Sequence, residues 1–177
     1  MGHDRMDRPS PLSTCPVPVE QQPLNEYQHL RESWFFRWAT RPWPRYLGIA
    51  LWIWGLSWVV AGPVAAASFP IAKYPLQFCL SGALGASVPL LLALTHLYLG
   101  WKYVRDRLAS EQISYEESGW YDGQLWPKPA AMRDRDRLVV TYQIQPWLQR
   151  LQWTLVGLAG LWAIVGGGWW LWASLDW

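Results

Sequence analysis

Two side chains near the start of the chain have the spacing of a metal site. Glu26 and His29 form a Glu-x-x-His step, which a helix would place on one face. A carboxylate di-iron bundle requires two such steps and two further carboxylates from other helices. The 177-residue chain contains three histidines and no second step. The sequence therefore predicts no metal site of this kind.

His96 is a second imidazole that suggests chemistry, because it lies within a long apolar stretch. An ionisable group in a membrane segment is a functional hypothesis by default, and an imidazole can serve as an axial ligand to haem or chlorophyll. The competing interpretation is a histidine that is only hydrogen-bonded near the lipid headgroups. His96 is therefore a candidate ligand for chlorophyll or haem, although the sequence requires no cofactor.

Three carboxylates in a polar segment could bind a divalent cation or attract a basic partner: Glu116, Glu117 and Asp122. A charged hairpin is more often a solvated surface. The chain contains no nucleophile elbow, phosphate loop, zinc-ligand spacing or dinucleotide fingerprint. We therefore predict no catalytic residues and favour a protein that is not an enzyme. The positions of the basic residues are explained by the membrane topology predicted below and by attraction to anionic headgroups. Nucleic-acid binding is therefore not expected.

The elements that position these residues follow from the layout of the charges. Three long stretches contain no Asp, Glu, Lys or Arg: 46–72, 74–101 and 151–175. About 20 mainly apolar residues are enough to cross about 30 Å of hydrocarbon. The sequence therefore predicts a mainly α-helical membrane protein with three transmembrane helices, at about 45–61, 76–103 and 148–175.

Prolines interrupt two of these spans. Gly62-Pro63 should end or kink the first helix, and residues 64–75 should form an irregular segment at the outer interface. Pro89 in the middle of the second span is tolerated when neighbouring groups bond the freed carbonyl.

The basic residues predict the orientation. Six arginines precede the first span, Lys73 alone separates the first two, eight basic residues separate the second and third, and none follows. The positive-inside rule places the N-terminus and the large insert on the cytoplasmic side. The expected segments are a flexible N-terminal part (1–23), an interfacial helix (24–44), two spans (45–101), a cytoplasmic-side insert (102–146) and the third span with an outer tail (147–177).

The sixteen tryptophans also fit a membrane protein, because indole rings favour the lipid–water interface. Four deeper ones could stack on a pigment or quinone, although lipid-facing or interhelical packing is favoured: Trp52, Trp54, Trp58 and Trp162. Ala159, Ala163 and Gly167 recur at four-residue spacing, which allows a close approach of helices within the chain or with a partner.

Two polar segments share the cytoplasmic side. In residues 24–38, apolar side chains recur at three- or four-residue steps after Asn25, a candidate N-cap. This pattern predicts an amphipathic helix, which either lies in the membrane surface or forms the start of the first span.

The insert should begin with a helical continuation of the second span to Gln112, followed by a strand over 113–117. Ser118-Gly119 is a candidate two-residue turn, with Trp120-Tyr121 in the returning strand of a short β-hairpin, and Asp122-Gly123 is a second turn signal. Residues 133–144 fit a strand or a helix equally well, and Pro146 should end either one.

Three ordered motifs give the chain a resemblance to a known family. They are Cys-Pro-Val-Pro-Val-Glu-Gln-Gln-Pro-Leu-Asn-Glu-Tyr at 15–27 with Ser-Trp-Phe-Phe at 33–36; Tyr-Glu-Glu-Ser-Gly-Trp-Tyr-Asp-Gly-Gln at 115–124 with Trp126, Lys128 and Pro129; and Arg-Asp-Arg-Leu at 135–138 with Tyr142, Pro146, Leu148 and Arg150-Leu151. The pattern resembles an uncharacterised family of cyanobacteria and plastids, that of hypothetical chloroplast reading frame thirty-six. Its land-plant and algal members are called conserved in the green lineage and diatoms.

The resemblance implies a thylakoid membrane protein whose inner side faces the cytoplasm or stroma and whose C-terminus is lumenal. The family is associated with photosynthetic performance and stress, and the resemblance implies no catalytic residues. The expected partners are membrane lipids and other thylakoid membrane proteins. We therefore expect a non-enzymatic assembly or stress-protection factor for photosynthetic complexes. The alternative is a membrane enzyme or carrier for a hydrophobic ring compound, such as a quinone, tetrapyrrole or carotenoid.

Motif residues on the cytoplasmic side form the candidate interaction surface: Glu20, Asn25, Glu26, Tyr27, Tyr115, Glu116, Glu117, Trp120, Tyr121 and Asp122. The alternative is that these residues fold the insert against the N-terminal segment.

Overall fold

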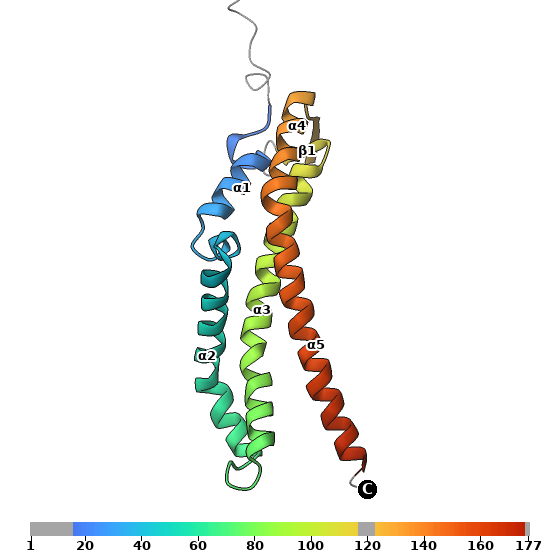
Figure 1. Ribbon diagram of the computed structural model, residues 1–177. Helices are drawn as coiled ribbons and strands as arrows, with labels where there is room; N and C mark the ends of the chain where they lie inside the picture. The colour runs from blue at the N-terminus through green and yellow to red at the C-terminus, as the bar shows by residue number, and fades with distance from the viewer. Residues whose placement is uncertain (1–15, 117–122, 176–177) are drawn as a thin grey trace, which may run out of the picture.

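Three long helices run side by side and join a small polar head at one end (Figure 1). The computed structural model describes residues 16–116 and 123–175, with side chains up to Trp169. The helices are α2 (Trp43–Ser68), α3 (Pro75–Ala109) and a composite third helix that ends with α5 (Gln145–Leu175). All three are long and apolar enough to cross a membrane, by length and composition. We call residues 16–32, 104–116 and 123–139 the polar head.

α2 and α3 form the main helix pair, because small residues let their backbones approach. A Cβ atom on Gly82 of α3 would lie 2.6 Å from the ring of Trp58 on α2. α2 continues through Gly62-Pro63 to Ser68, so the prediction of an irregular segment over 64–75 is wrong for residues 64–68. Proline removes one backbone hydrogen bond, and a long helix packed against a neighbour tolerates that loss.

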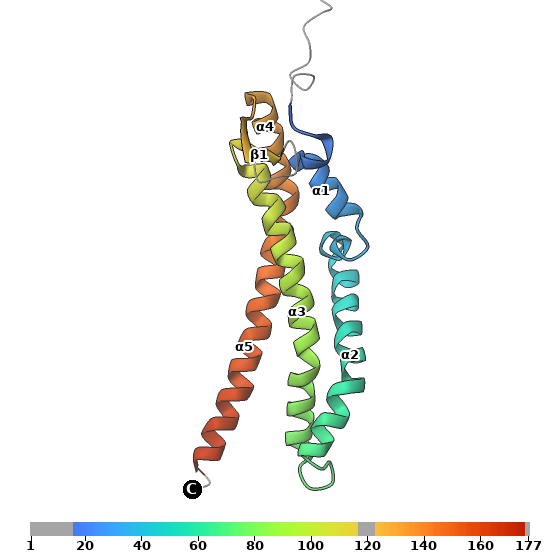
Figure 2. The ribbon, with the colours of Figure 1, turned by 180° about the vertical axis from the view of Figure 1, so that it is seen from behind.

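The third long helix is continuous from α4 (Ala130–Val139) to α5, although it contains Pro146 (Figure 2). Between them lies a π turn, η3 (Val140–Ile144), in which the Gln145 N–H donates to the carbonyl five residues back. The wider turn makes room for the proline ring, which would clash with a regular helical turn. The prediction that Pro146 ends the segment is therefore wrong, and residues 133–144 are helical.

β1 (Gln112–Glu116) and β2 (Gly123–Pro127) form the predicted hairpin as a two-stranded antiparallel sheet. The register pairs Glu116 with Gly123. A two-residue turn at Ser118-Gly119 would have placed Glu116 opposite Tyr121, so that detail is wrong. The connection, residues 117–122, lies outside the described part of the chain.

The N-terminal segment folds as separate short helices: η1 (Val19–Gln21), α1 (Pro23–Glu32) and η2 (Phe36–Thr40). The amphipathic helix ends at Glu32 instead of continuing to Trp38, because Ser33 leaves the helical conformation (φ −58°, ψ 131°). The N-cap residue is Gln22 and not Asn25, whose side chain donates to the Val19 carbonyl at 2.6 Å. Since η2 separates α1 from α2, α1 is not the start of the first span.

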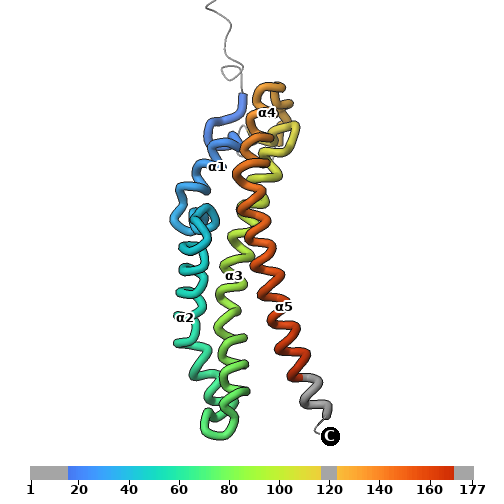
Figure 3. Tube along the Cα trace, in the orientation of Figure 1, coloured from blue at the N-terminus to red at the C-terminus, as the bar shows by residue number. Residues whose placement is uncertain are grey.

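The main core lies where α1, η2, the first turns of α2, α3 and α5 meet, and it encloses Tyr46, Leu97 and Trp101 completely. Toward its C-terminal end α5 leans away from α2 and α3 (Figure 3). The helices expose large apolar side chains, such as Trp52 of α2 at 72% and Ile164 of α5 at 74%. Large apolar patches of this kind are rare on water-soluble proteins and mark membrane or protein contacts.

Candidate functional site

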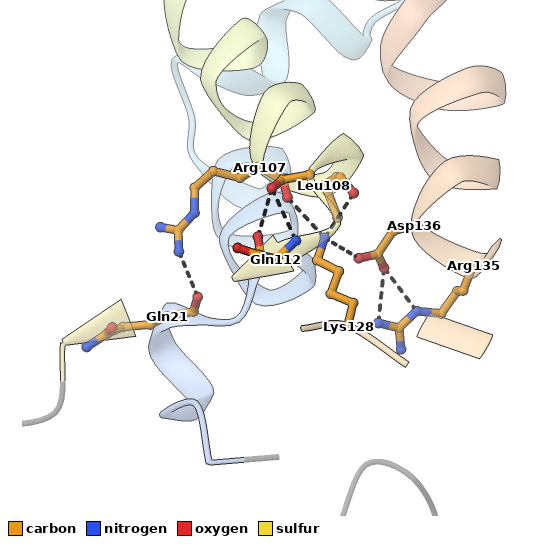
Figure 4. A network of polar contacts seen from close by, with 8 residues as sticks. Gln21, Arg107, Leu108, Gln112, Lys128, Arg135 and Asp136 are labelled. Carbon is orange, nitrogen blue, oxygen red and sulfur yellow. Dashed lines mark hydrogen bonds and ion pairs between the residues drawn. The ribbon is translucent and has the colours of Figure 1, made fainter. Parts of the chain in front are cut away.

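Arg107, near the end of α3, connects three parts of the polar head. Its guanidinium donates to Glu26 Oε1 of α1 at 2.5 Å, to the Gln21 carbonyl of η1 at 3.3 Å and to the Ser114 carbonyl of β1 at 2.9 Å. Figure 4 shows the contact with Gln21. A planar group with five donors suits such a junction. One side chain thus joins the N-terminal segment to the hairpin.

Gln21 makes a second link between the same two segments. Its side-chain amide donates to the Glu116 carbonyl at 3.1 Å and accepts from the Glu116 N–H at 2.9 Å. The amide therefore satisfies both backbone groups of an edge-strand residue. The Glu116 backbone is fixed by this pairing, while the residue as a whole stays exposed.

Glu26 is a partly enclosed carboxylate that acts as the ion-pair partner of Arg107. Burial raises the pKa of Glu26, and the charge and hydrogen bond of Arg107 offset only part of that effect. Its Oε2 atom is enclosed and has no hydrogen-bond partner among the described residues. His29, the other half of the Glu-x-x-His step, is exposed. Within residues 16–116 and 123–175, no cluster of three His, Cys, Asp or Glu could hold a metal ion.

A fully buried ion pair fixes the hairpin to α4 (Figure 4). Lys128 Nζ donates to Asp136 Oδ2 at 3.0 Å and to the carbonyls of Arg107 and Leu108 at 3.0 and 2.9 Å. The two charged side chains are 0% and 1% exposed. Both carbonyls belong to the last turn of α3, which lacks helical donors, so the lysine also caps that helix. Sequence reasoning missed this pair, although both residues lie in the family-like motifs.

Two residues of the predicted interaction surface are buried instead. Tyr27 packs edge-on against Trp101 at 6.0 Å between ring centres, and its hydroxyl donates to Gln143. Tyr115 lies in a smaller core with Val17, Ile113 and Met132. Their position between the N-terminal segment and the rest of the chain gives both tyrosines a packing role.

The other predicted surface residues differ in exposure. Glu20 and Glu116 are exposed, and Asn25 is half-buried. Four of the ten lie outside the described residues: Glu117, Trp120, Tyr121 and Asp122. The structure therefore brings Glu26 and the Glu116 backbone together around Arg107 and Gln21, and leaves Glu20 on the surface beside them.

His96 lies apart from the head. It is exposed on α3 and packs against the rings of Phe35 and Phe36 at 5.6 and 5.4 Å between ring centres. Its role as a pigment or haem ligand stays a prediction.

Arg150 of α5 anchors the segment that leads into α2. Its guanidinium donates to the carbonyl of Arg41 at 2.8 Å and to that of Ala39. It also stacks on the rings of Tyr46 and Trp43, 4.5 and 5.3 Å from their centres. Sequence reasoning assigned Arg150 to the positive-inside pattern and to the third family-like motif. It missed these contacts, because the residues that Arg150 contacts lie more than a hundred positions earlier in the chain.

The model of the CGLD27-like family, described as Conserved in the green lineage and diatoms 27, matches residues 15–157. This chain belongs to that family. A relative in Porphyra purpurea, named uncharacterized protein ycf36, is 45% identical over 142 residues, which cover 80% of this chain and 86% of the relative. The chloroplastic protein Conserved in the green lineage and diatoms 27 of Arabidopsis thaliana is 43% identical over 153 residues, which cover 85% of this chain and 46% of the relative. No solved structure matches the chain.

The CGLD27-like match confirms the resemblance predicted from the three motifs. It includes the whole polar head and Arg150, and it ends within α5. The name of the Arabidopsis relative places that protein in the chloroplast. Together with three apolar helices, this family membership suggests a plastid-type membrane protein.

Proposed function

We propose that this CGLD27-like protein is a three-span thylakoid membrane protein that acts, without catalysis, as an assembly or stress-protection factor for photosynthetic complexes. One observation carries the proposal: three long helices expose apolar side chains, while ion pairs and polar contacts gather in one head. An apolar exterior is stable in lipid and costly in water. The name of the Arabidopsis relative places that protein in the chloroplast, which supports the thylakoid as the membrane in which this chain lies.

In this proposal the head contacts partner proteins on the cytoplasmic or stromal side, where the positive-inside rule puts it. Arg107 and Lys128 hold the N-terminal segment, the hairpin and α4 in one arrangement. Exposed residues such as Glu20 and Glu116 therefore form a surface of defined shape. The polar groups inside the head mostly satisfy one another, which suits a binding surface better than a reactive site.

Affinity purification from solubilised thylakoids tests this function. A deletion strain of an oxygenic phototroph is complemented with the tagged wild-type chain or with a Glu20→Lys, Glu116→Lys double variant. We expect the wild type to purify with a photosynthetic complex or its assembly intermediate, and the double variant to reach the membrane without that partner. Lys73→Glu, exposed in the loop at the opposite end of the molecule, is a charge-reversal control away from the head and should retain the partner.

Recovery of the wild type only as a free monomer, with unchanged photosystem intermediates in the deletion strain, would contradict the proposal. A Glu20→Lys, Glu116→Lys variant that keeps its partner would instead assign the contact to another surface.

A groove between α3 and α5 favours a second function, a carrier or enzyme for a hydrophobic ring compound. Its volume is about 350 Å³, and it is lined by Leu76, Gln77, Leu80, Ile164, Val165, Gly168 and Trp169. An apolar groove of this size with one polar side chain suits a quinone, tetrapyrrole or carotenoid ring. Absorption spectroscopy of protein purified in mild detergent distinguishes the two functions. Tryptophan bands alone, with unchanged pigment and quinone profiles in the deletion strain, would exclude this alternative.

A further inference from the structure

A groove at the head-proximal end of α5 combines three indole rings with an arginine. It has a volume of about 320 Å³ and is lined by Trp43, Pro146, Trp147, Gln149, Arg150 and Trp153. Trp43 and Trp153 are 54% and 75% exposed, so the groove opens to the surroundings of the helices. It lies outside the head surface proposed above for protein contacts.

The charge of Arg150 has no counter-charge in the described structure. Its two terminal nitrogens donate to neutral backbone carbonyls, and its Nε atom is enclosed without a partner among the described residues. None of the ion pairs found in that part of the chain includes it. The sequence explains why, because residues 41–102 and 137–175 contain no Asp or Glu.

A partly enclosed cation beside apolar surface is costly unless a negative charge compensates it. The helices around Arg150 contain no carboxylate that could do so. A ligand with a negative charge at one end and apolar groups at the other would fit both the guanidinium and the indole rings.

We propose that this groove binds one anionic membrane lipid, with its headgroup at Arg150 and Gln149 and an acyl chain along Trp43 and Trp153. Indole rings favour the depth at which headgroups meet acyl chains. Basic pockets between transmembrane helices on the cytoplasmic side bind anionic headgroups. The groove itself is open, because Trp43 and Trp153 on its wall are exposed, and toward its C-terminal end α5 leans away from α2 (Figure 1). The inference rests on the proposed membrane insertion and adds a ligand class to it.

Native mass spectrometry of the full chain in mild detergent tests the site. The protein is titrated with phosphatidylglycerol or phosphatidylcholine that carry the same acyl chains. We expect one phosphatidylglycerol to bind at least about fivefold more tightly than phosphatidylcholine, the order of effect of one basic residue near an anionic headgroup.

Two variants with the same change in net charge separate the groove from general electrostatics. Gln149→Glu puts a negative charge at an exposed position of the groove wall and should abolish the preference for phosphatidylglycerol. Arg45→Gln is the matched control. Arg45 lies two residues after Trp43 in α2, and that spacing places it on the opposite side of the helix. Arg45 is exposed, and its variant should bind both lipids as the wild type does.

Equal affinity for the two lipids, or an unchanged preference in Gln149→Glu, would overturn the proposal. Displacement of the lipid by inorganic phosphate at equal concentration would also overturn it, since the site would then take a free anion. Alkaline extraction of the membranes tests insertion separately. A chain that stays in the membrane but shows no lipid preference would reject the lipid site alone and leave the proposed function intact.

Discussion

The ammonium group of Lys128 donates hydrogen bonds to three acceptors. Loss of this side chain therefore affects α3, the hairpin and α4 together. Lys128→Met should leave Asp136 buried with only the half-exposed Arg135 as partner and should free two carbonyls at the end of α3. Removing one member of a buried ion pair costs about 3–5 kcal/mol. We expect a loss of that size in the free energy of unfolding, measured in mild detergent by circular dichroism.

The matched control for this substitution is Lys102→Met, an exposed lysine on α3 that makes no ion pair in the described structure. It should change stability by less than about 0.5 kcal/mol. A Lys128→Met, Asp136→Leu double variant should recover part of the loss, because an apolar pair often replaces a buried ion pair without cost. Equal stability of the two lysine variants would show that the buried pair contributes nothing.

Glu26 gives the head a pH dependence whose sign follows from its surroundings. Because burial raises the pKa of Glu26, the folded chain keeps this proton to higher pH than the unfolded chain, whose carboxyl titrates near 4.5. The free energy of unfolding should therefore fall as the pH rises from 4.5 toward the raised pKa, and this contribution should level off above it. Thermal melts of Glu26→Gln at stepped pH should lack that fall. Glu20→Gln, at an exposed position, should retain it.

At the scale of elements, the α2–α3 pair depends on the missing side chain of Gly82. A methyl group there would lie 2.6 Å from the Trp58 ring, so Gly82→Ala should force the ring or the helices apart at a cost of about 1–3 kcal/mol. Gly55→Ala, on α2, is the control, because an added Cβ would meet nothing within 4 Å. Unfolding in detergent, followed by tryptophan fluorescence, measures both. If both variants were equally stable, the close approach at Gly82 would not limit the packing.

Elements with a strong local pattern could be predicted from the sequence. The charge-free stretches indicated the three apolar helices, and alternation over 113–117 indicated β1. The sequence did not predict that the helices continue through Pro63 and Pro146. Packing of α2 and the π turn before Pro146 compensate for the lost hydrogen bonds, and neither is visible in the sequence. The head contacts of Arg107 were also missed. Glu26 lies 81 positions before it, and only the path of the folded chain brings the two together.

At the scale of the whole molecule, the polar head and the loop at 69–74 lie at opposite ends (Figure 1). If the helices cross the membrane, the two ends face different compartments. In a chain with Cys15→Ser and Cys79→Ser, we expect Ala131→Cys and Ile71→Cys, both at exposed positions, to react with an impermeant maleimide from opposite sides of sealed thylakoids. Labelling of both from one side would contradict the three-span topology.

The long contacts of the N-terminal segment also determine when it can fold during synthesis. The partner of Tyr27 lies 116 positions later, and the donor to the Ala39 carbonyl lies 111 positions later. A ribosome adds about 5–20 residues per second, so α1 and η2 emerge several seconds before their docking partners exist. During that interval the N-terminal segment is open to targeting factors, chaperones and proteases. This exposure therefore lasts at least until the residues of η3 and α5 that contact the N-terminal segment have been synthesised.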